Sequence, residues 1–462
     1  MRKNGSMTRR PKASLTEPSD RLLNGAPGPA RNPEAPSSRF AGLDTPPVRK
    51  VDRRGFLRAG AALAAAAATV RGVMAREETA RAEPAVPPSA PSLPPPLTRE
   101  FHLGRLQQSA ELMRAQKVSH LVCAPGPDLF YLTGLALERG DRFSGLIAPV
   151  DGPAVLLCPV EDRGIVESGP GVVEEIVYYD DTEDPLTLAV KQLKKGNASS
   201  VALSGRIWYE EFVPLYGDLP KLTFSLGYPF VGALRRIKSL EEIALIETAA
   251  RMAREAAEWG VAGLREGMRE EDIEMSLVTR LRARGSRALV LVQSGPRTLA
   301  PRAHAGDRAI GRGDTVVITC ETEVRGYRAR VSRSAVLGGA TGRMKTIQQT
   351  IVEGQGFVFE RVKPSIPAPA IDQTMRAALG KRGFLKQLLH TTGAGCGLEY
   401  PEPPFLGPGY FERLAQGDVF TVGQGVYTPG DYGLRQEDVL LVTADGARWL
   451  STPATSLVEI GA

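Results

Sequence analysis

The sequence predicts a mixed α/β (α+β) protein in which two domains follow one another, at residues 99–231 and 232–462. In the first stretch, short apolar runs typical of strands alternate with segments that carry apolar residues at helical spacing. In the second stretch the order is two helices, strands, two helices and strands, so the same pattern occurs twice. This duplicated order predicts a pseudo-symmetric second domain.

The first domain opens with an amphipathic helix, expected over residues 100–116, that places Leu106 and Met113 on one face. A further helix is expected over residues 185–194. Strands are expected at five apolar runs, namely 118–123, 144–149, 153–158, 172–179 and 200–203.

The second domain begins at a capping box, in which Ser239 precedes Glu242 by three residues and starts a long helix. A second amphipathic helix is expected over residues 270–284. The later elements are expected as strands 288–293, 314–320 and 327–337, helices 341–362 and 368–381, and strands near 420–422 and 434–443.

The positive charge of the chain is concentrated in its first 75 residues. The formal charge of the whole chain is +6, while residues 1–75 hold 14 Lys and Arg against 5 Asp and Glu. That segment therefore carries +9 and the remainder −3. A basic face for nucleic acid is not indicated, and we expect no nucleic-acid partner.

Two arginines, Arg53 and Arg54, precede Phe56, and an uncharged Ala-rich run follows at 59–70. Twin arginines before a short, weakly apolar segment are typical of a Tat export signal, which predicts a periplasmic or extracellular protein. The alternative is a chance Arg-Arg pair before a helix. The run is too short for a stable membrane span. Residues 1–75 are expected to be a disordered leader with this signal, and residues 76–98 a Pro-rich linker.

Three stretches of the second domain carry motifs, at residues 313–334, 392–399 and 420–437. Together they resemble the metal-binding strands of the pita-bread family, which includes Xaa-Pro dipeptidases and aminopeptidases, methionine aminopeptidases and creatinase. The segment at 127–134 is similar to a stretch in the N-terminal domain of creatinase and the Xaa-Pro peptidases. The resemblance spans roughly residues 98–460. It implies a creatinase-like N-terminal domain, a pita-bread domain and a homodimer.

The resemblance also implies five metal-ligand positions, which fall on Thr319, Arg330, Ala394, Gly423 and Glu437. Only Glu437 keeps the donor of the family pattern. Two neighbouring divalent ions need carboxylates and imidazole to offset their charge, whereas Arg330 places a permanent positive charge in the site. We therefore expect no metal and no cofactor.

If the fold is kept, Arg302, Arg330 and Glu437 should converge. Arg330 then either pairs with Glu437 and fills the pocket, or forms a cationic pocket for a carboxylate or phosphate. Glu402 matches a ligand-binding position of the family whose neighbouring His is absent here. These features favour a ligand-binding protein or pseudoenzyme for a small-molecule or peptide ligand, perhaps an anionic one.

Two catalytic alternatives remain open. One is metal-independent hydrolysis of a C–N bond, as the resemblance to creatinase implies, with Glu437, Glu321, His304 or His390 as acid or base. The other is a working Xaa-Pro metallopeptidase that takes unusual ligands from Glu321, His304 and His390.

The four cysteines show no C-x-x-C spacing, and a disulfide framework is not indicated in a chain of this size. Cys123 and Cys158 lie in apolar, strand-like runs. Their pairing stays open, because an exported protein meets an oxidising compartment.

Overall fold

The computed structural model describes residues 93–461. The expected leader and export signal at 1–75, and the expected linker as far as residue 92, lie outside the described residues. Within 93–461 no helix has the length and apolar character needed to cross a membrane.

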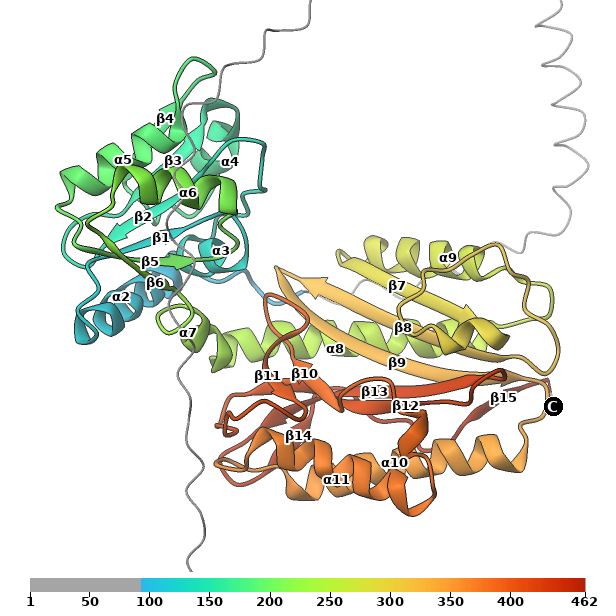
Figure 1. Cartoon of the computed structure of the whole chain (residues 1–462). Coiled ribbons are helices and arrows are strands. Elements are labelled where there is room, and N and C mark those ends of the chain that lie inside the picture. Colours follow the sequence, from blue (N-terminus) through green and yellow to red (C-terminus); the bar gives the residue numbers. More distant parts are fainter. Residues whose placement is uncertain (1–92, 462) are drawn as a thin grey trace, which may run out of the picture. The chain divides into compact units, whose positions relative to one another are not determined.

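The N-terminal domain is a six-stranded sheet in the order β4-β3-β2-β1-β5-β6 (Figure 1). Its central strand β1 pairs antiparallel with β2 and parallel with β5. The strands are β1 (His120–Cys123), β2 (Gly145–Pro149), β3 (Val155–Pro159), β4 (Glu175–Tyr179), β5 (Ser200–Ser204) and β6 (Thr223–Leu226). The helices are α2 (Arg99–Ala115), α3 (Pro127–Thr133), α4 (Arg163–Glu167), α5 (Pro185–Lys195) and α6 (Tyr209–Asp218), with a short 3₁₀ turn at Val160–Asp162.

Alternate residues of β1 face opposite helical layers, as the two-residue period of a strand requires. Leu121 and Cys123 belong to the apolar core that includes Met113 of α2 and Leu129 of α3. Val122 belongs instead to the core formed with α5 and α6. Because both faces are covered, the strand is buried throughout its length.

The C-terminal domain has a sheet whose main path is β11-β10-β12-β13-β9-β8-β7, with β14 beside β13 and β15 beside β9. Its strands are β7 (Arg287–Ser294), β8 (Thr315–Val324), β9 (Tyr327–Leu337), β10 (Gly393–Gly395), β11 (Glu402–Leu406), β12 (Val419–Tyr427), β13 (Gly433–Val442), β14 (Ala447–Trp449) and β15 (Val458–Ile460). Its helices are α7 (Gly232–Arg236), α8 (Leu240–Ala262), α9 (Glu270–Ala283), α10 (Gly342–Arg361) and α11 (Ala368–Lys381), with 3₁₀ turns at Gly295–Leu299 and Leu385–Gln387.

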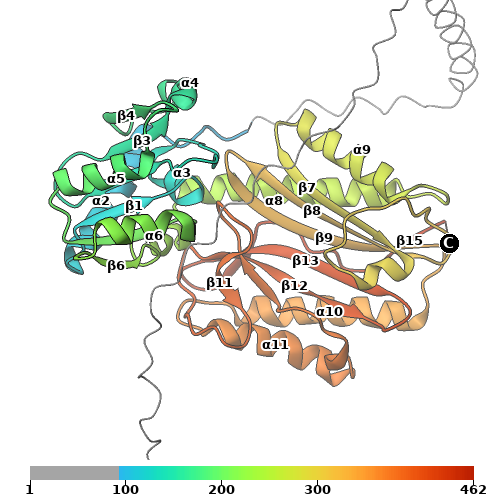
Figure 2. The same cartoon turned by 45° about the horizontal axis from the view of Figure 1, so that its top comes forward.

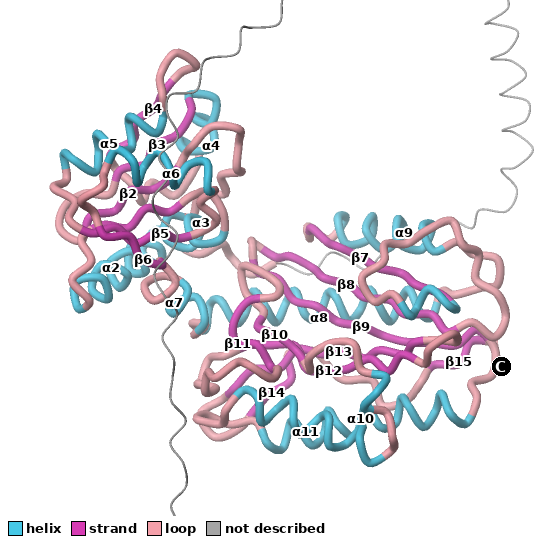
Figure 3. The backbone as a smooth tube through the Cα atoms, viewed as in Figure 1, coloured by secondary structure: helices cyan, strands magenta, loops and turns pink. Residues whose placement is uncertain are grey.

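The helices of this domain form two pairs that cover two halves of the sheet. Helix α8 packs on β8 and β9 and α9 on β7, while α10 packs on β12 and β13 and lies beside α11 (Figures 1 and 2). The two halves meet where β9 and β13 run side by side, which the tube in Figure 3 also shows. Only one pair of residues, Ser332 and Glu437, is in ladder register across this seam.

The predicted fold class, mixed α/β with a duplicated second half, is confirmed. The capping box is also present, since Ser239 Oγ accepts a hydrogen bond from the Glu242 N–H and the Glu242 carboxylate accepts one from the Ser239 N–H. The prediction missed the helices α3, α4, α6 and α7 and the strands β6, β10, β11, β14 and β15.

All four cysteine thiols are free and buried. Cys123 lies on β1 and Cys158 on β3, and strand β2 separates them in the sheet. The structure therefore does not contain the disulfide that the sequence left open.

Candidate functional site

The residues of β9 and β13 divide between two faces of the sheet. Val331 of β9 belongs to the core that includes helix α8, and Leu440 of β13 belongs to the core that includes helices α10 and α11. Arg330 is one position from Val331 and Glu437 is three positions from Leu440, so both lie on the opposite face of the sheet. We call this second surface the open face.

Glu437 lies at the centre of the open face and is 3% exposed. Its Oε2 accepts hydrogen bonds from Arg435 Nη2 at 2.7 Å and from Ser332 Oγ at 3.0 Å. Its Oε1 accepts one from the Tyr400 hydroxyl at 3.2 Å. Arg330 Nε lies 3.7 Å from Oε2, which is an ion pair without a hydrogen bond. The structure thus places Arg330 beside Glu437, but Arg435 is the closer partner.

These charges determine the protonation of Glu437. Burial alone would raise its pKa, but the positive charges of Arg435 and then Arg330 lower the pKa to about 2. The side chain is therefore an acceptor-only carboxylate at neutral pH.

The other positions of the family's metal ligands surround this carboxylate. Thr319 Oγ1 and Ser332 Oγ lie 2.8 Å apart, so a chain of hydroxyls leads from β8 to Glu437. Ala394 is buried on β10. Gly423 lies directly opposite Glu437 in the β12–β13 ladder.

Gly423 has no room for a side chain in this backbone. A Cβ atom there would lie 2.0 Å from the carbonyl oxygen of Gln436 and 2.6 Å from Cα of Glu437. Both atoms belong to the backbone of β13, so a rotamer change cannot relieve the clash. The position can be occupied only by glycine unless β12 and β13 move apart.

His390 lies near Glu437 in a buried environment. Its Nδ1 contacts the Thr391 carbonyl oxygen at 2.8 Å, so Nδ1 carries the proton and donates. Its Nε2 then accepts from the Tyr427 hydroxyl at 3.0 Å. Burial, followed by the charge of Arg435, lowers the pKa of His390 to about 4. The ring is therefore neutral at pH 7, with both nitrogens already engaged.

Glu321 lies opposite Arg330 in the β8–β9 ladder. Burial raises its pKa, while the charge of Arg330 acts in the opposite direction. Its carboxylate pairs with Arg328 at 3.4 Å, and Arg328 also pairs with Glu323 at 2.8 Å. Glu321 lines a hollow of about 190 Å³ that is bordered by residues of β7, β8 and β9.

The loop after β7 holds the other two sequence candidates, Arg302 and His304, and both are exposed. The carbonyl oxygen of His304 accepts a hydrogen bond from Arg297 at 2.7 Å. Within residues 93–461, no hydrogen bond or ion pair joins the side chain of Arg302 or His304 to Glu437. The structure does not bring these two residues together with Arg330 and Glu437.

Glu402 belongs to a separate ionic cluster. Its two oxygens accept hydrogen bonds from Arg235 Nη2 at 2.6 Å and from Lys238 Nζ at 2.7 Å. Arg235 also pairs with Asp128 at 2.6 Å. Both oxygens are thus paired with cations, and within residues 93–461 no hydrogen bond or ion pair joins Glu402 to Glu437.

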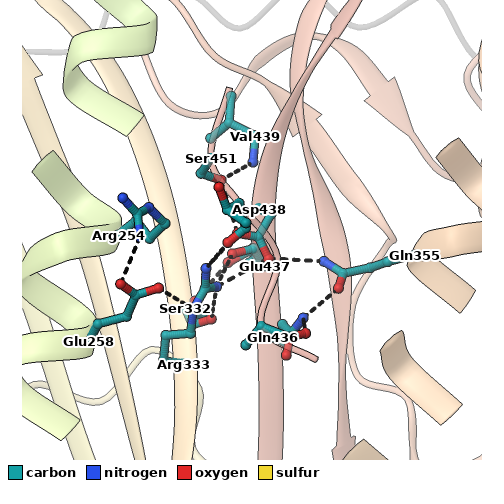
Figure 4. A network of polar contacts seen from close by, with 12 residues as sticks. Arg254, Glu258, Ser332, Arg333, Gln355, Gln436, Glu437, Asp438, Val439 and Ser451 are labelled. Atoms are coloured by element: carbon teal, nitrogen blue, oxygen red, sulfur yellow. Dashed lines mark hydrogen bonds and ion pairs between the residues drawn. The ribbon is translucent and has the colours of Figure 1, made fainter. Parts of the chain in front are cut away.

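A second polar network lies next to Glu437, and Figure 4 shows it between β9 and β13. Arg333 forms a bidentate pair with Asp438, with Nη2 to Oδ1 at 2.7 Å and Nη1 to Oδ2 at 3.1 Å. Gln355 and Ser451 donate to the same carboxylate. This network joins the two halves of the sheet at the seam.

Sequence reasoning did not assign roles to Arg435, Tyr400 and Tyr427. Arg435 could have been found, because it stands two residues before Glu437 on one strand and must face the same side. Tyr427 could also have been found, because it stands four residues after Gly423 on β12 and faces the same side. Tyr400 lies between β10 and β11, on a segment whose spacing carries no periodic signal toward Glu437.

Two protein-family profiles match this chain. Residues 105–237 match the creatinase/prolidase N-terminal domain, and residues 244–444 match metallopeptidase family M24. Among curated proteins, the putative dipeptidase YkvY of Bacillus subtilis is 28% identical over 329 residues, which is 69% of this chain and 90% of that protein. The probable dipeptidase PepE of Mycobacterium bovis is 29% identical over 360 residues, 75% of this chain and 94% of that protein.

Solved structures show the same architecture. The dipeptidase PepE from Mycobacterium ulcerans matches with a TM-score of 0.74 and 24% identity over 79% of this chain and 100% of its own. A dipeptidase from Pyrococcus horikoshii matches with a TM-score of 0.71 and 26% identity over 77% of this chain and 100% of its own. Both domains described above are covered by such matches.

Proposed function

The chain belongs to the pita-bread family of Xaa-Pro peptidases, metallopeptidase family M24, and we propose that it is a member that binds a small-molecule or peptide ligand without metal-dependent catalysis. The observation that carries this proposal is the setting of Glu437, whose carboxylate is in contact with two guanidinium groups. Of the two, Arg330 stands at a metal-ligand position of the family pattern, so a permanent positive charge lies where a metal-holding member has a carboxylate ligand.

The donors on the open face do not fit a pair of divalent ions. Within residues 93–461, no three side chains of His, Cys, Asp or Glu are grouped so that they could hold a metal ion. Thr319 offers a neutral hydroxyl, and Ala394 offers no donor. A cation bound by Glu437 would also meet the charges of Arg330 and Arg435, which are permanent at neutral pH.

Metal analysis tests this proposal directly. The purified full-length protein, expressed with added manganese, cobalt or zinc, is expected to contain far less than one ion per chain by mass spectrometry. A content of about two ions per chain, as a dinuclear site requires, would contradict the proposal. In the same preparation, a chelator should leave the melting temperature unchanged.

The metal-independent hydrolase is the competing hypothesis, and the geometry of His390 weighs against it. Both ring nitrogens are hydrogen-bonded, and the low pKa leaves the imidazole a weak base. We therefore expect no turnover of glycyl-proline or creatine in the presence of a chelator. Turnover that disappears in Glu437→Gln would establish the hydrolase instead.

Export and assembly are further parts of the proposal. The twin arginines Arg53 and Arg54 support Tat export to the periplasm or the extracellular space. Fractionation of cells expressing the full chain should find it outside the cytoplasm, and the double change of Arg53→Lys and Arg54→Lys should retain it inside. The family resemblance supports a homodimer, which light scattering of the purified protein would detect.

A further inference from the structure

We propose that Arg330 and Arg435 form a binding site for a monoanionic carboxylate, which is the charged end of the ligand. This inference rests on the proposed function and names the chemical class that the open face accepts.

The two guanidinium groups have more donors than Glu437 can use. Each guanidinium carries five N–H groups. Arg435, whose side chain is 8% exposed, donates to Glu437 through Nη2 alone, and its Nε is buried without a partner. The side chain of Arg330 donates no hydrogen bond to any residue between 93 and 461, and its Nε is also buried without a partner. Buried charged donors of this kind require an acceptor.

The arrangement of Arg330 suits a ligand that approaches its edge. The guanidinium lies over the ring of Tyr400, 5.2 Å from the ring centroid, so the aromatic ring covers one of its faces. The side chain keeps 14% of its surface exposed. Carboxylates bind a guanidinium in its plane through two parallel hydrogen bonds, which leaves the stacked face undisturbed.

The charges on the open face favour a monoanion over a dianion. Arg330, Arg435 and Glu437 together carry a net charge of +1, which one carboxylate neutralises. Further out, Glu321 and Glu323 share Arg328, so the neighbouring group carries −1. A phosphate dianion would leave the inner group of Arg330, Arg435 and Glu437 at −1, and Glu437 and Glu321 would repel it more strongly than a monoanion.

Calorimetric titration of the full-length protein with a chelator present tests the proposal. The probes are N-acetyl-L-proline, which is a monoanion at neutral pH, its uncharged amide, and inorganic phosphate. The acid should bind at least about tenfold more tightly than the amide or phosphate, since a charged bidentate contact contributes that much or more. Equal affinity for acid and amide, tighter binding of phosphate, or no binding of the acid would each overturn the proposal.

Variants locate the site. Arg330→Ala should weaken binding of the acid about tenfold or more, and Arg330→Lys should weaken it less, because lysine keeps the charge but loses the bidentate geometry. Arg448→Ala is the matched control, since Arg448 is an exposed arginine on β14 that pairs with Glu247. Unchanged affinity in a folded Arg330→Ala protein would contradict the assignment.

The change Glu437→Gln should have the opposite effect on the affinity for the acid. Glu437 competes with the ligand for Arg435, so its neutral isostere should bind the acid more tightly than the wild type does. A site that uses Glu437 to attract a cationic ligand would lose affinity instead. The titrations contain a chelator, so the two proposals can fail separately. If the acid does not bind and metal analysis finds no metal, only the carboxylate site is overturned. If the acid binds and metal analysis finds about two ions per chain, only the proposed function is overturned.

Discussion

The ionisation of Glu437 links the candidate site to stability. The pKa of this carboxyl falls from an ordinary 4.5 to about 2 in the folded protein, because Arg435 and Arg330 outweigh the effect of burial. A group with a depressed folded pKa stabilises the protein above its unfolded pKa and loses that contribution as the pH falls through its folded pKa. The contribution is therefore complete above about pH 4.5 and lost toward pH 2.

Glu437→Gln should lower the free energy of unfolding by about 3 kcal/mol at pH 7, which corresponds to that pKa difference. The difference between wild type and variant should shrink as the pH falls from 4.5 toward 2, because the wild-type carboxylate becomes protonated. Urea unfolding at several pH values measures both quantities. A difference that is independent of pH in this window would show that the arginines do not hold Glu437 in its ionised form.

The close approach of β12 and β13 at Gly423 can be tested by substitution. Gly423→Ala should destabilise the protein by at least about 2 kcal/mol, because its Cβ would meet the backbone of β13. Gly356→Ala is the control. Gly356 is an exposed glycine inside helix α10 with open space around it, so alanine there should stabilise by about 0.5–1 kcal/mol. Equal effects of the two changes in urea unfolding would contradict the close approach of β12 and β13.

Some residues of the site can be predicted from the sequence, and others cannot. Arg435 and Glu437 are two apart on one strand, so their shared face can be predicted. Tyr400 and His390 come from the segments on either side of β10, and only the folded chain brings them to Glu437. Arg302 lies on the loop after β7, whose path is not determined by any periodic pattern.

The seam between strands β9 and β13 depends on side chains. Ladder register is kept at one residue pair, while Ser334 Oγ exchanges hydrogen bonds with the backbone of Arg435. The Arg333–Asp438 pair adds a buried, bidentate link. Such a pair is costly to break, because its partner is left charged in a dry environment.

Asp438→Asn should therefore destabilise the protein by about 3–5 kcal/mol, since the buried Arg333 would lose its counter-charge. Hydrogen exchange should locate the effect, with faster exchange of β9 and β13 amides than of β1 amides in the other domain. Asp445→Asn is a control, because Asp445 lies in an exposed turn after β13. If both variants unfold at the same urea concentration, the network does not hold the seam.

The elements that could be predicted are those with a strong local signal. The apolar period specifies α8 and α9, and the capping box marks the start of α8. Short apolar runs specify β1 and the first half of β8, and alternation of apolar and polar residues specifies β9. Strand β10 is only Gly-Ala-Gly, and β11 contains Pro403 and Pro404, which disfavour a strand assignment. Both exist because neighbouring strands pair with them, which is tertiary information.

The whole molecule combines proposed export with four thiols that the fold keeps apart from one another and from solvent. Burial raises the pKa of all four cysteines, to about 12 for Cys158 and Cys320 and further for Cys123 and Cys396. The thiolate, which is the reactive form, is therefore scarce at neutral pH. In addition, strand β2 lies between β1, which carries Cys123, and β3, which carries Cys158.

The native full-length protein should consequently show no thiol that reacts with a disulfide reagent within minutes, whereas the denatured protein should show four. Its melting temperature should be the same with and without reductant, because no disulfide constrains the unfolded chain. Protein recovered from the periplasm is the decisive sample, since it has met an oxidising compartment. Fewer than four thiols after denaturation of that sample would mean that a disulfide forms before or during folding, and that the arrangement of β1, β2 and β3 described above is not the exported state.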